Sequence, residues 1–186
     1  MEFIETGIDG AWLIQPRRHA DSRGYFCETF RAEAFEEHIG PVRFVQENES
    51  MSVRGVVRGL HFQAPPYTQA KLVRVSEGLV LDVAVDLRPG SPTFGRNIAV
   101  ELSADTGRQL YVPKGFAHGF AVLSPTARFQ YKVDAYYHPE AEGAIRFDDP
   151  SLDIDWRVPR QEMILSAKDL AAQSYAEYLK SPVLSR

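Results

Sequence analysis

The sequence predicts an all-β protein, built as a β sandwich, a barrel or a jelly roll, and three observations support this. Short segments of alternating apolar residues follow one another, turn residues separate them at regular intervals, and few segments favour a helix. A chain of 186 residues with 44% hydrophobic and 25% charged residues is typical of a soluble globular protein. We expect it to form a single domain over residues 1–186.

The clearest strand is expected at residues 79–87, where apolar residues at odd positions alternate with a second set that contains two aspartates. A period of two indicates a strand because successive side chains point to opposite faces. Turn residues flank the segment, with Gly78 before it and Pro89 after it. The same pattern predicts further strands at residues 97–103, 108–112, 117–123 and 127–136.

Helices are expected to be few, short and peripheral. Residues 31–38 contain helix-forming residues and stop before Gly40 and Pro41, as a short helix does. Residues 166–180 form the better candidate, because Leu170, Tyr175 and Leu179 belong to a rough apolar stripe. We therefore predict a second helix there.

Composition excludes several broad functions. The net charge of −4, without a basic run, argues against general nucleic-acid binding. Cys27 is the only cysteine, so no intrachain disulfide is possible. No apolar run approaches the roughly 20 residues of a membrane span, and the first residues lack the layout of a secretory signal. We expect a cytoplasmic protein with no membrane partner.

The polar residues Arg58, His61, Gln63 and Lys71 lie in otherwise strand-like sequence. A single histidine in a strand is more often an ordinary core or surface residue than a catalyst. Burying several polar groups without partners, however, costs a few kcal/mol for each. A solvated cavity that binds a polar ligand is the simpler interpretation of this group.

His61, Lys71 and Tyr131 fit the chemistry of proton abstraction beside a carbonyl. Histidine supplies a base near neutral pH, lysine can hold the oxygen of the developing enolate, and a tyrosine hydroxyl can donate a proton from the opposite face. Taken singly, Tyr131 is more typical of a core aromatic residue and Lys71 of a solvated strand residue. Only the combination favours catalysis.

Asp169 has two competing interpretations. The segment Ser166-Ala167-Lys168-Asp169 has the spacing of a helix capping box, and on sequence alone capping is the favoured role. Alternatively, the Asp169 carboxylate orients His61, as the acidic member of a catalytic triad orients its histidine. We expect the side chain to serve one role or the other.

Other residues indicate recognition of a phosphate and a base. Arg23 and Arg58 each stand beside a glycine, where a ligand can approach the backbone, and their forked donors match phosphate oxygens. Tyr136 and Tyr137 could stack on a base or pack in the core, and the sequence leaves both open.

Taken together, these motifs resemble the dTDP-4-dehydrorhamnose 3,5-epimerase family over nearly the whole chain, from about Ile14 to Asp169. The segments that carry the resemblance are, in order, residues 21–28 (DSRGYFCE), 45–50 (VQENES), 57–63 (VRGLHFQ), 71–75 (KLVRV), 82–88 (DVAVDLR), 90–95 (GSPTFG) and 112–120 (VPKGFAHGF). The resemblance implies a cupin-like jelly-roll barrel and a dTDP-4-keto-6-deoxyhexose substrate. It also implies a homodimer with a shared active site and no metal or organic cofactor.

The resemblance also implies a role for individual residues. His61 is similar to the family's base and Asp169 to its orienting partner, Lys71 to the group on the C4 oxygen and Tyr131 to the proton donor. Positions similar to the family's substrate-binding residues are Arg23, Phe26, Glu28, Gln46, Asn48, Arg58, His118, Tyr137, Glu142 and Lys168. The implied reaction is inversion of both C3 and C5 of the hexose.

Four alternatives remain at this point. Related enzymes invert only C3 or only C5, and a ketoisomerase on the same scaffold is more distant. A sugar-nucleotide-binding cupin without catalysis is the alternative from another class. A metal-dependent cupin oxygenase is disfavoured, because His61-Phe62-Gln63 replaces the usual His-x-His pair and Lys71 would repel a cation.

Overall fold

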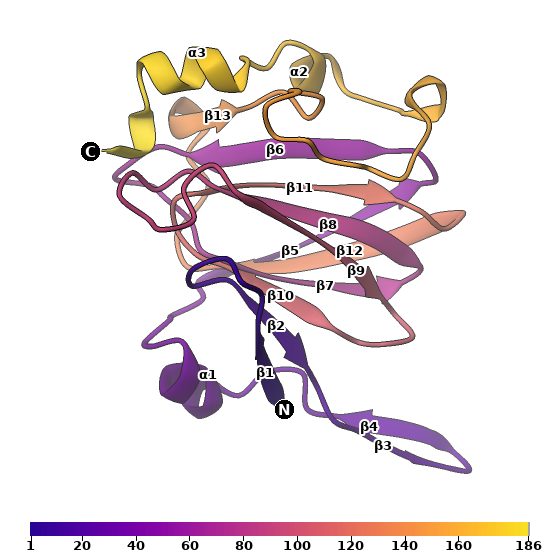
Figure 1. The fold of residues 1–186 in the computed structure, drawn as a ribbon. Helices are drawn as coiled ribbons and strands as arrows, with labels where there is room; N and C mark the ends of the chain where they lie inside the picture. Colours follow the sequence, from indigo (N-terminus) through magenta and orange to yellow (C-terminus); the bar gives the residue numbers. More distant parts are fainter. Residues whose placement is uncertain (186) are drawn as a thin grey trace.

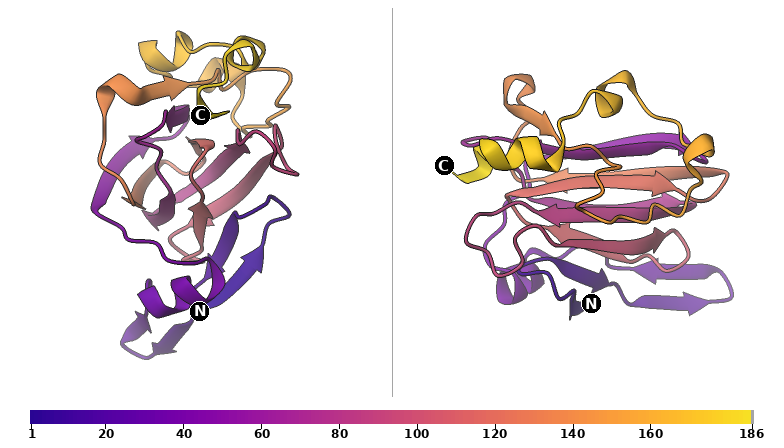
Figure 2. Two further views of the ribbon diagram at one scale, coloured as in Figure 1. Left: turned by 90° about the vertical axis from the view of Figure 1, so that its left-hand side faces the viewer. Right: turned by 45° about the horizontal axis from the view of Figure 1, so that its top comes forward.

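The structure, a computed structural model, describes residues 1–185 and consists mainly of two β-sheets packed face to face (Figures 1 and 2). The six-stranded sheet has the order β1 (Glu2–Glu5), β2 (Trp12–Gln15), β10 (Gln109–Val112), β7 (Lys71–Glu77), β12 (Thr126–Val133), β5 (Gln46–Val53). The five-stranded sheet has the order β13 (Glu142–Ala144), β6 (Val57–Gln63), β11 (Phe116–Val122), β8 (Leu79–Asp86), β9 (Asn97–Ser103). The predicted all-β, jelly-roll class is confirmed.

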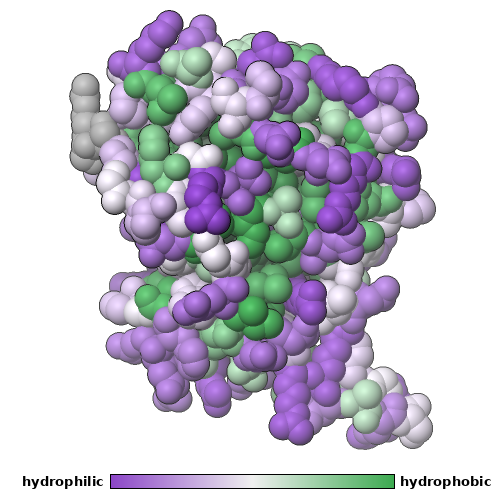
Figure 3. Space-filling view, in the orientation of Figure 1, coloured by the Kyte–Doolittle hydropathy of each residue, from purple (hydrophilic) through white to green (hydrophobic). Residues whose placement is uncertain are grey.

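A separate hairpin of β3 (Arg18–Asp21) and β4 (Gly24–Cys27) projects from the body of the molecule. Figure 3 shows the same face: apolar side chains gather across its middle, hydrophilic side chains cover the parts above and below, and the hairpin stands clear at the lower right. Most side chains of the hairpin are therefore exposed.

The strand predictions agree with the structure except near element ends. The strand expected at residues 97–103 is β9, and those at 79–87, 108–112 and 117–123 match β8, β10 and β11 to within one residue at either end. The strand expected at residues 127–136 is β12, which ends earlier, at Val133. Beyond Val133 the chain leaves the sheet, so that Tyr136 and Tyr137 are exposed rather than packed in the core.

One helix was predicted correctly and the other only in part. The helix α1 (Ala32–His38) follows the prediction and buries Phe35 against the outer face of the six-stranded sheet. The segment 166–180 is not one helix but two short ones, α2 (Ala167–Leu170) and α3 (Tyr175–Lys180), each with its own capping box. Three 3-10 turns also occur: Pro139–Ala141, Arg160–Glu162, Val183–Ser185.

Hydrophobic residues fill both faces of the five-stranded sheet. On β8, Leu81, Val83 and Val85 pack into an outer cluster, while Val80 and Ala84 pack into a cluster shared with the six-stranded sheet. The alternation in the sequence therefore separates two buried faces rather than a buried face from a solvated one. Charged residues are rare in a strand that is buried on both faces, because burying an unpaired charge is costly.

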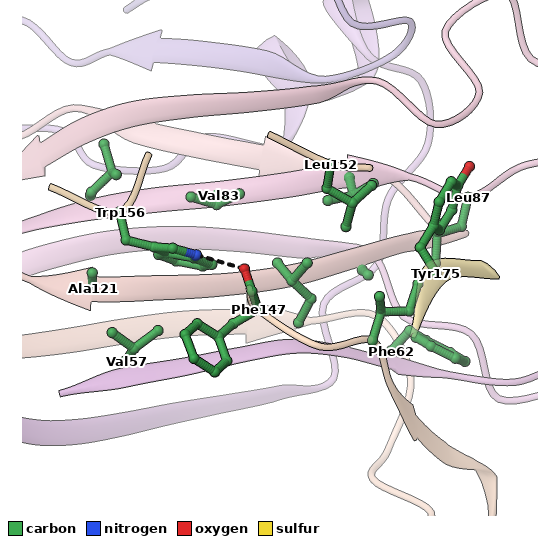
Figure 4. Packing of buried hydrophobic residues seen from close by; sticks show 14 of the residues in the cluster. Val57, Phe62, Val83, Leu87, Ala121, Phe147, Leu152, Trp156 and Tyr175 are labelled. Atoms are coloured by element: carbon green, nitrogen blue, oxygen red, sulfur yellow. Dashed lines mark hydrogen bonds between the residues drawn. The ribbon is translucent and has the colours of Figure 1, made fainter. Parts of the chain in front are cut away.

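The C-terminal segment covers the outer face of this sheet. Figure 4 shows Phe147 and Trp156 near Val57 and Ala121, and Tyr175 at the other end of the cluster beside Leu87 and Phe62. The Trp156 indole N–H donates to the Phe147 carbonyl at 2.8 Å. This cover holds α2 beside β6, which brings the end of the chain to the site described below. Within residues 1–185 no helix is long and apolar enough to cross a membrane.

Candidate active site

Strand alternation places the predicted catalytic residues between the two sheets. On β7, Val73 and Val75 point into the space between the sheets, so Lys71, two positions before Val73, points the same way. On β12, Phe129 and Tyr131 belong to the same inner row. Two neighbouring strands thus aim an ammonium group and a phenol into one space.

A local irregularity in β6 brings two more side chains to the same side. The pairing of β6 with β11 places His118 opposite His61 and Phe120 opposite Arg58, so β6 uses three steps where β11 uses two. In a regular strand, residues three apart face opposite sides. Because β6 contains this bulge, Arg58 and His61 both line the same cavity.

Two glycines make the bulge possible. A Cβ on Gly59 would lie 2.5 Å from the Gly119 Cα, and a Cβ on Gly119 would lie 2.4 Å from the Arg58 carbonyl oxygen. Such contacts are too close for any side chain, so both positions require glycine. Gly59 also has a φ of +128°, which L-residues rarely adopt.

The inward-facing residues surround a cavity of about 220 Å³. Its lining comes from five strands: Glu49, Ser50, Arg58, His61, Lys71, His118, Gly119, Phe120, Phe129, Tyr131. A second cavity of about 110 Å³ shares His61, Lys71 and Tyr131 with the first and extends to Tyr137 and Glu142. All four residues that the sequence suggested for catalysis therefore meet here, with Asp169 behind His61.

His61 is held by Asp169. The His61 Nε2 lies 2.7 Å from Asp169 Oδ1, and the Asp169 side chain is almost fully buried. Burial alone would raise the pKa of Asp169, but hydrogen bonds from His61 and Ser166 outweigh it and lower the pKa to about 2. Asp169 is therefore an ionised acceptor, so the proton of a neutral His61 ring sits on Nε2 and Nδ1 carries the lone pair.

The expectation that Asp169 serves only one role was wrong. Its Oδ1 accepts from His61 and, at 3.2 Å, from the Gly59 backbone N–H, while its Oδ2 accepts from the Ser166 hydroxyl at 2.6 Å. Ser166 in turn accepts from the Asp169 backbone N–H, which completes the capping box of α2. A carboxylate has two oxygens with about four acceptor sites, so one oxygen caps the helix while the other holds the histidine.

Lys71 lies between the sheets with its ammonium group largely out of water. This burial lowers the pKa of Lys71 to about 8, although the carboxylates of Asp82 and Glu142 partly oppose the shift. Near neutral pH the side chain therefore remains largely a cation that can release its proton readily. It is not the solvated strand residue of the alternative interpretation.

Tyr131 and the neighbouring strand β5 supply the opposite wall. Burial raises the pKa of Tyr131, while a hydrogen bond with the Asn48 side chain and the nearby Arg58 act against the increase. The phenol is therefore protonated at neutral pH and available as a donor. Gln46 donates to the Asn48 side-chain oxygen at 2.8 Å, so these two predicted binding residues hold each other beside Tyr131.

His118 has a partner that the sequence interpretation missed. Its Nε2 lies 3.0 and 3.1 Å from the two oxygens of Asp82, a side chain with no exposed surface. Asp82 was recognised only as part of the alternation of its strand. The available signal was a charged residue at an inner position of a strand that is otherwise buried on both faces.

Three further predicted residues form the rim of the cavity. The Tyr137 hydroxyl donates to Glu142 Oε2 at 2.6 Å, and the Lys168 ammonium pairs with the same carboxylate oxygen. Tyr137 is about half exposed, so its ring is accessible to a ligand. These residues come from the loop after β12, from β13 and from α2, and they meet at the mouth of the second cavity.

Arg23, Phe26 and Glu28 do not join this site within the chain. Arg23 and Phe26 lie on the projecting hairpin, with 88% of the Arg23 side chain and 71% of Phe26 exposed. Arg23 pairs with Asp21, and Glu28 with Arg31. Among residues 1–185, no group of three or more histidine, cysteine or acidic side chains is arranged to hold a metal ion.

The double role of Asp169 gives a testable consequence for Ser166→Ala. This change removes the cap of α2 and one acceptor bond of the carboxylate that holds His61, so we expect a loss of about 1 kcal/mol in unfolding free energy and roughly tenfold lower kcat. Ser174→Ala is the matched control, because Ser174 caps α3 through the same capping box with Glu177. It should cost similar stability and leave kcat unchanged; an equal effect of both variants on kcat would contradict the link.

The two packed sheets and the acid–base residues between them place this protein in the class of jelly-roll acid–base enzymes. The model of the dTDP-4-dehydrorhamnose 3,5-epimerase family matches residues 5–177. A dTDP-4-dehydrorhamnose 3,5-epimerase of Escherichia coli (strain K12) is 52% identical over 171 residues, which cover 91% of this chain and 91% of that protein. The chain belongs to the dTDP-4-dehydrorhamnose 3,5-epimerase family.

Two other relatives show the range of this similarity. The crystal structure of a dTDP-6-deoxy-D-glucose-3,5-epimerase from Legionella pneumophila Philadelphia 1, in complex with dTDP-4-keto-L-rhamnose, has a TM-score of 0.93 and 49% identity, covering 100% of this chain and 97% of that one. A dTDP-4-dehydrorhamnose 3-epimerase of Streptomyces niveus is 43% identical over 178 residues, which cover 95% of this chain and 85% of that protein.

Proposed function

We propose that this protein inverts C3 and C5 of dTDP-4-dehydro-6-deoxy-D-glucose and so forms dTDP-4-dehydro-L-rhamnose. The observation that carries the proposal is that His61, Lys71 and Tyr131 line one cavity, with Asp169 bonded to His61 behind it. Its relatives named as 3,5-epimerases and the sugar nucleotide in the Legionella pneumophila structure support the same substrate class. Location in the cytoplasm stays a prediction.

The reaction follows from the acidity of hydrogens beside a ketone. The lone pair on His61 Nδ1 accepts the proton, the electrons of the broken C–H bond form an enolate, and the negative charge moves to the C4 oxygen. The Lys71 ammonium stabilises that oxygen. Asp169 holds the ring and stabilises the imidazolium that forms. Tyr131 then donates its proton to the opposite face of the carbon, which inverts the centre.

One set of groups can serve both carbons. C3 and C5 flank the same C4 ketone, so the enolate oxygen occupies one place whichever hydrogen is removed. A change of ring conformation presents the second carbon to His61. We assign recognition of the phosphates and of the base to the rim of the cavity. The exposed Tyr137 ring is suited to stack on the base, and the Lys168 ammonium is suited to a phosphate.

A reductase-coupled assay tests this function. The enzyme is incubated with dTDP-4-dehydro-6-deoxy-D-glucose, a 4-ketoreductase for dTDP-4-dehydro-L-rhamnose is added, and the product sugar is identified by proton NMR. Formation of dTDP-L-rhamnose is the expected result. Unchanged substrate stereochemistry at both carbons would reject the proposal and leave a binding protein on the same fold.

A single-site epimerase is the second candidate, and the similarity to the Streptomyces niveus 3-epimerase favours it. The same four residues would perform the chemistry, but the product would leave before a change of ring conformation presents the second carbon to His61. The coupled assay separates the two candidates, because inversion at one carbon gives a different dTDP-sugar.

The pKa of Lys71 predicts an alkaline limit to activity. Because burial lowers this pKa to about 8, the ammonium loses its proton as the pH rises through 8, and the charge that stabilises the enolate is lost. We expect kcat/KM measured between pH 6 and 10 to fall above a midpoint near pH 8. A profile that stays flat to pH 10 would contradict the role of Lys71.

We infer a homodimer in which each projecting hairpin reaches the cavity of the other subunit. The hairpin exposes Arg23, Tyr25 and Phe26 to solvent, and none of the three lines the cavity of its own chain. A forked guanidinium and an aromatic ring are suited to a nucleoside diphosphate. Sedimentation velocity should give a mass near twice 20.9 kDa.

Mixed dimers test this sharing directly. Arg23→Ala should raise KM about 10- to 100-fold, the loss expected for one charged hydrogen bond, without lowering stability. A co-expressed dimer of one Arg23→Ala chain and one His61→Asn chain contains one intact site if the hairpin acts across the interface. We expect it to recover about half of the wild-type activity. Recovery no better than that of the two parent variants would show that Arg23 acts within its own chain.

A further inference from the structure

The floor of the cavity contains a second histidine–carboxylate pair that the reaction above does not use. His118 on β11 and Asp82 on β8 lie on neighbouring strands, where His118 is opposite Ala84 and Asp82 is opposite Phe120. Both side chains are buried, with 7% and 0% of their surface exposed. A fully buried carboxylate needs a reason, because burying a charge is costly unless it is paired.

We propose that Asp82 is a positioning residue for the reaction: its carboxylate fixes the His118 ring in one tautomer and places a negative charge behind the side chains that line the cavity. The proposal rests on the proposed epimerase function for its kinetic consequences. Both Asp82 oxygens face His118 Nε2, which therefore carries the ring proton. The other nitrogen, Nδ1, is then an acceptor on a ring that lines the cavity. A sugar hydroxyl is the donor that matches it.

The same carboxylate is a counter-charge for the cation of the cavity. Lys71 is attracted by Asp82 on β8 and by Glu142 on β13, and it interacts unfavourably with His118 on β11. The other ionisable groups that line the cavity are Arg58 and His61 on β6, Tyr131 on β12 and Glu49 on β5. Glu49 is paired with Arg128. Glu142 is already paired with the Lys168 ammonium at the rim, whereas Asp82 bonds the His118 ring inside the protein.

His118 is neutral because it is buried, although Asp82 favours its charged form. Burial lowers the pKa of His118 more than the nearby Asp82 raises it. The ring is therefore neutral near pH 7, and its two nitrogens differ in role. A neutral ring held by Asp82 adds no second positive charge beside Lys71, and it cannot compete with Tyr131 as an acid.

The variant Asp82→Asn removes the negative charge of the carboxylate but keeps the size of the side chain. An asparagine oxygen can still accept from His118, but the negative charge that attracts Lys71 is gone. We expect kcat to fall about 10²-fold and the alkaline limb of kcat/KM to move down by about one pH unit. Asp86→Asn is the matched control, because Asp86 is also fully buried on β8 but bonds Arg88, Ser91 and Thr93 outside the cavity. Its alkaline limb should stay near pH 8, whatever its stability.

A second measurement uses the unaltered protein and needs no turnover. Nitrogen-15 NMR of the histidine rings, with His118 assigned by comparison with His118→Gln, should show Nε2 protonated and Nδ1 unprotonated at pH 7.5. An Nδ1–H tautomer or an imidazolium would overturn the proposal, and so would an unmoved alkaline limb in folded Asp82→Asn. Inactive wild-type enzyme would reject the proposed function, while this spectrum would still decide the role of Asp82.

Discussion

His61→Asn should lower kcat by about 10³-fold or more while leaving the affinity for dTDP within about twofold. The variant removes the only lone pair that Asp169 orients into the cavity, and a positioned base contributes roughly 10²- to 10⁴-fold to such a step. Binding of dTDP should persist, because the proposed nucleotide contacts lie at the rim and on the hairpin. Calorimetric titration with dTDP and the coupled assay measure the two quantities.

His38→Asn is the control for this change. His38 lies on α1, on the far side of the six-stranded sheet, where it stacks on Phe3 and contacts the Ala34 carbonyl. The same substitution there should leave kcat unchanged. Activity of His61→Asn within tenfold of the wild type would remove His61 from the role of base.

Lys71→Met should lower kcat by about 10²- to 10³-fold, the size expected for loss of a group that stabilises a developing oxyanion. Methionine has a similar length and suits the space between the sheets, so the variant should fold. The alkaline limb near pH 8 should disappear from the small remaining activity, because the group that titrates is gone. A pH series of kcat/KM on both proteins measures this.

Lys114→Met is the matched control for the lysine. Lys114 is about half exposed and pairs with Asp134 at 3.0 Å, outside the cavity. Its replacement should change neither kcat nor the alkaline limb. If the kcat/KM of Lys71→Met still falls above pH 8 as in the wild type, another group titrates near pH 8. The assignment of this pH dependence to Lys71 would then be wrong.

Much of the fold follows from the sequence because its signals are local. The alternation in residues 79–87 and the turns on either side depend only on neighbouring residues, and β8 lies where they indicate. The error in residues 166–180 has the opposite cause. Tyr175 and Tyr178 pack against the outer face of the five-stranded sheet, whereas Leu170 and Leu179 are exposed. Tertiary packing, rather than a continuous apolar stripe along one helix, therefore decides where the helix breaks.

The geometry of the site depends on features that no local pattern reveals. Alternation alone would place Arg58 and His61 on opposite faces, and the bulge at Gly59 reverses this through contact with Gly119, far along the chain. Capping of α2 and orientation of His61 would exclude each other only if Asp169 were a single acceptor, whereas a carboxylate has two oxygens. Its two oxygens face different partners because α2 lies beside β6.

The hairpin and Asp82 mark two other limits of sequence interpretation. Phe26 and Arg23 look like site residues in the sequence, yet one chain cannot show which cavity they serve. Asp82 looks like an ordinary member of an alternating strand until the opposite strand places His118 beside it. The role of Asp82 depends on a contact between distant segments, and the proposed role of the hairpin depends on a contact between subunits.

Proton NMR of the substrate in deuterated water tests the central claim most directly, with wild-type enzyme and His61→Asn side by side. Removal of a proton by His61 at each carbon, followed by return of a proton from solvent, should place deuterium at both C3 and C5 with the wild type and at neither carbon with the variant. Inversion without deuterium, or wild-type exchange in His61→Asn, would contradict the account. Deuterium at one carbon alone would limit the enzyme to a single inversion.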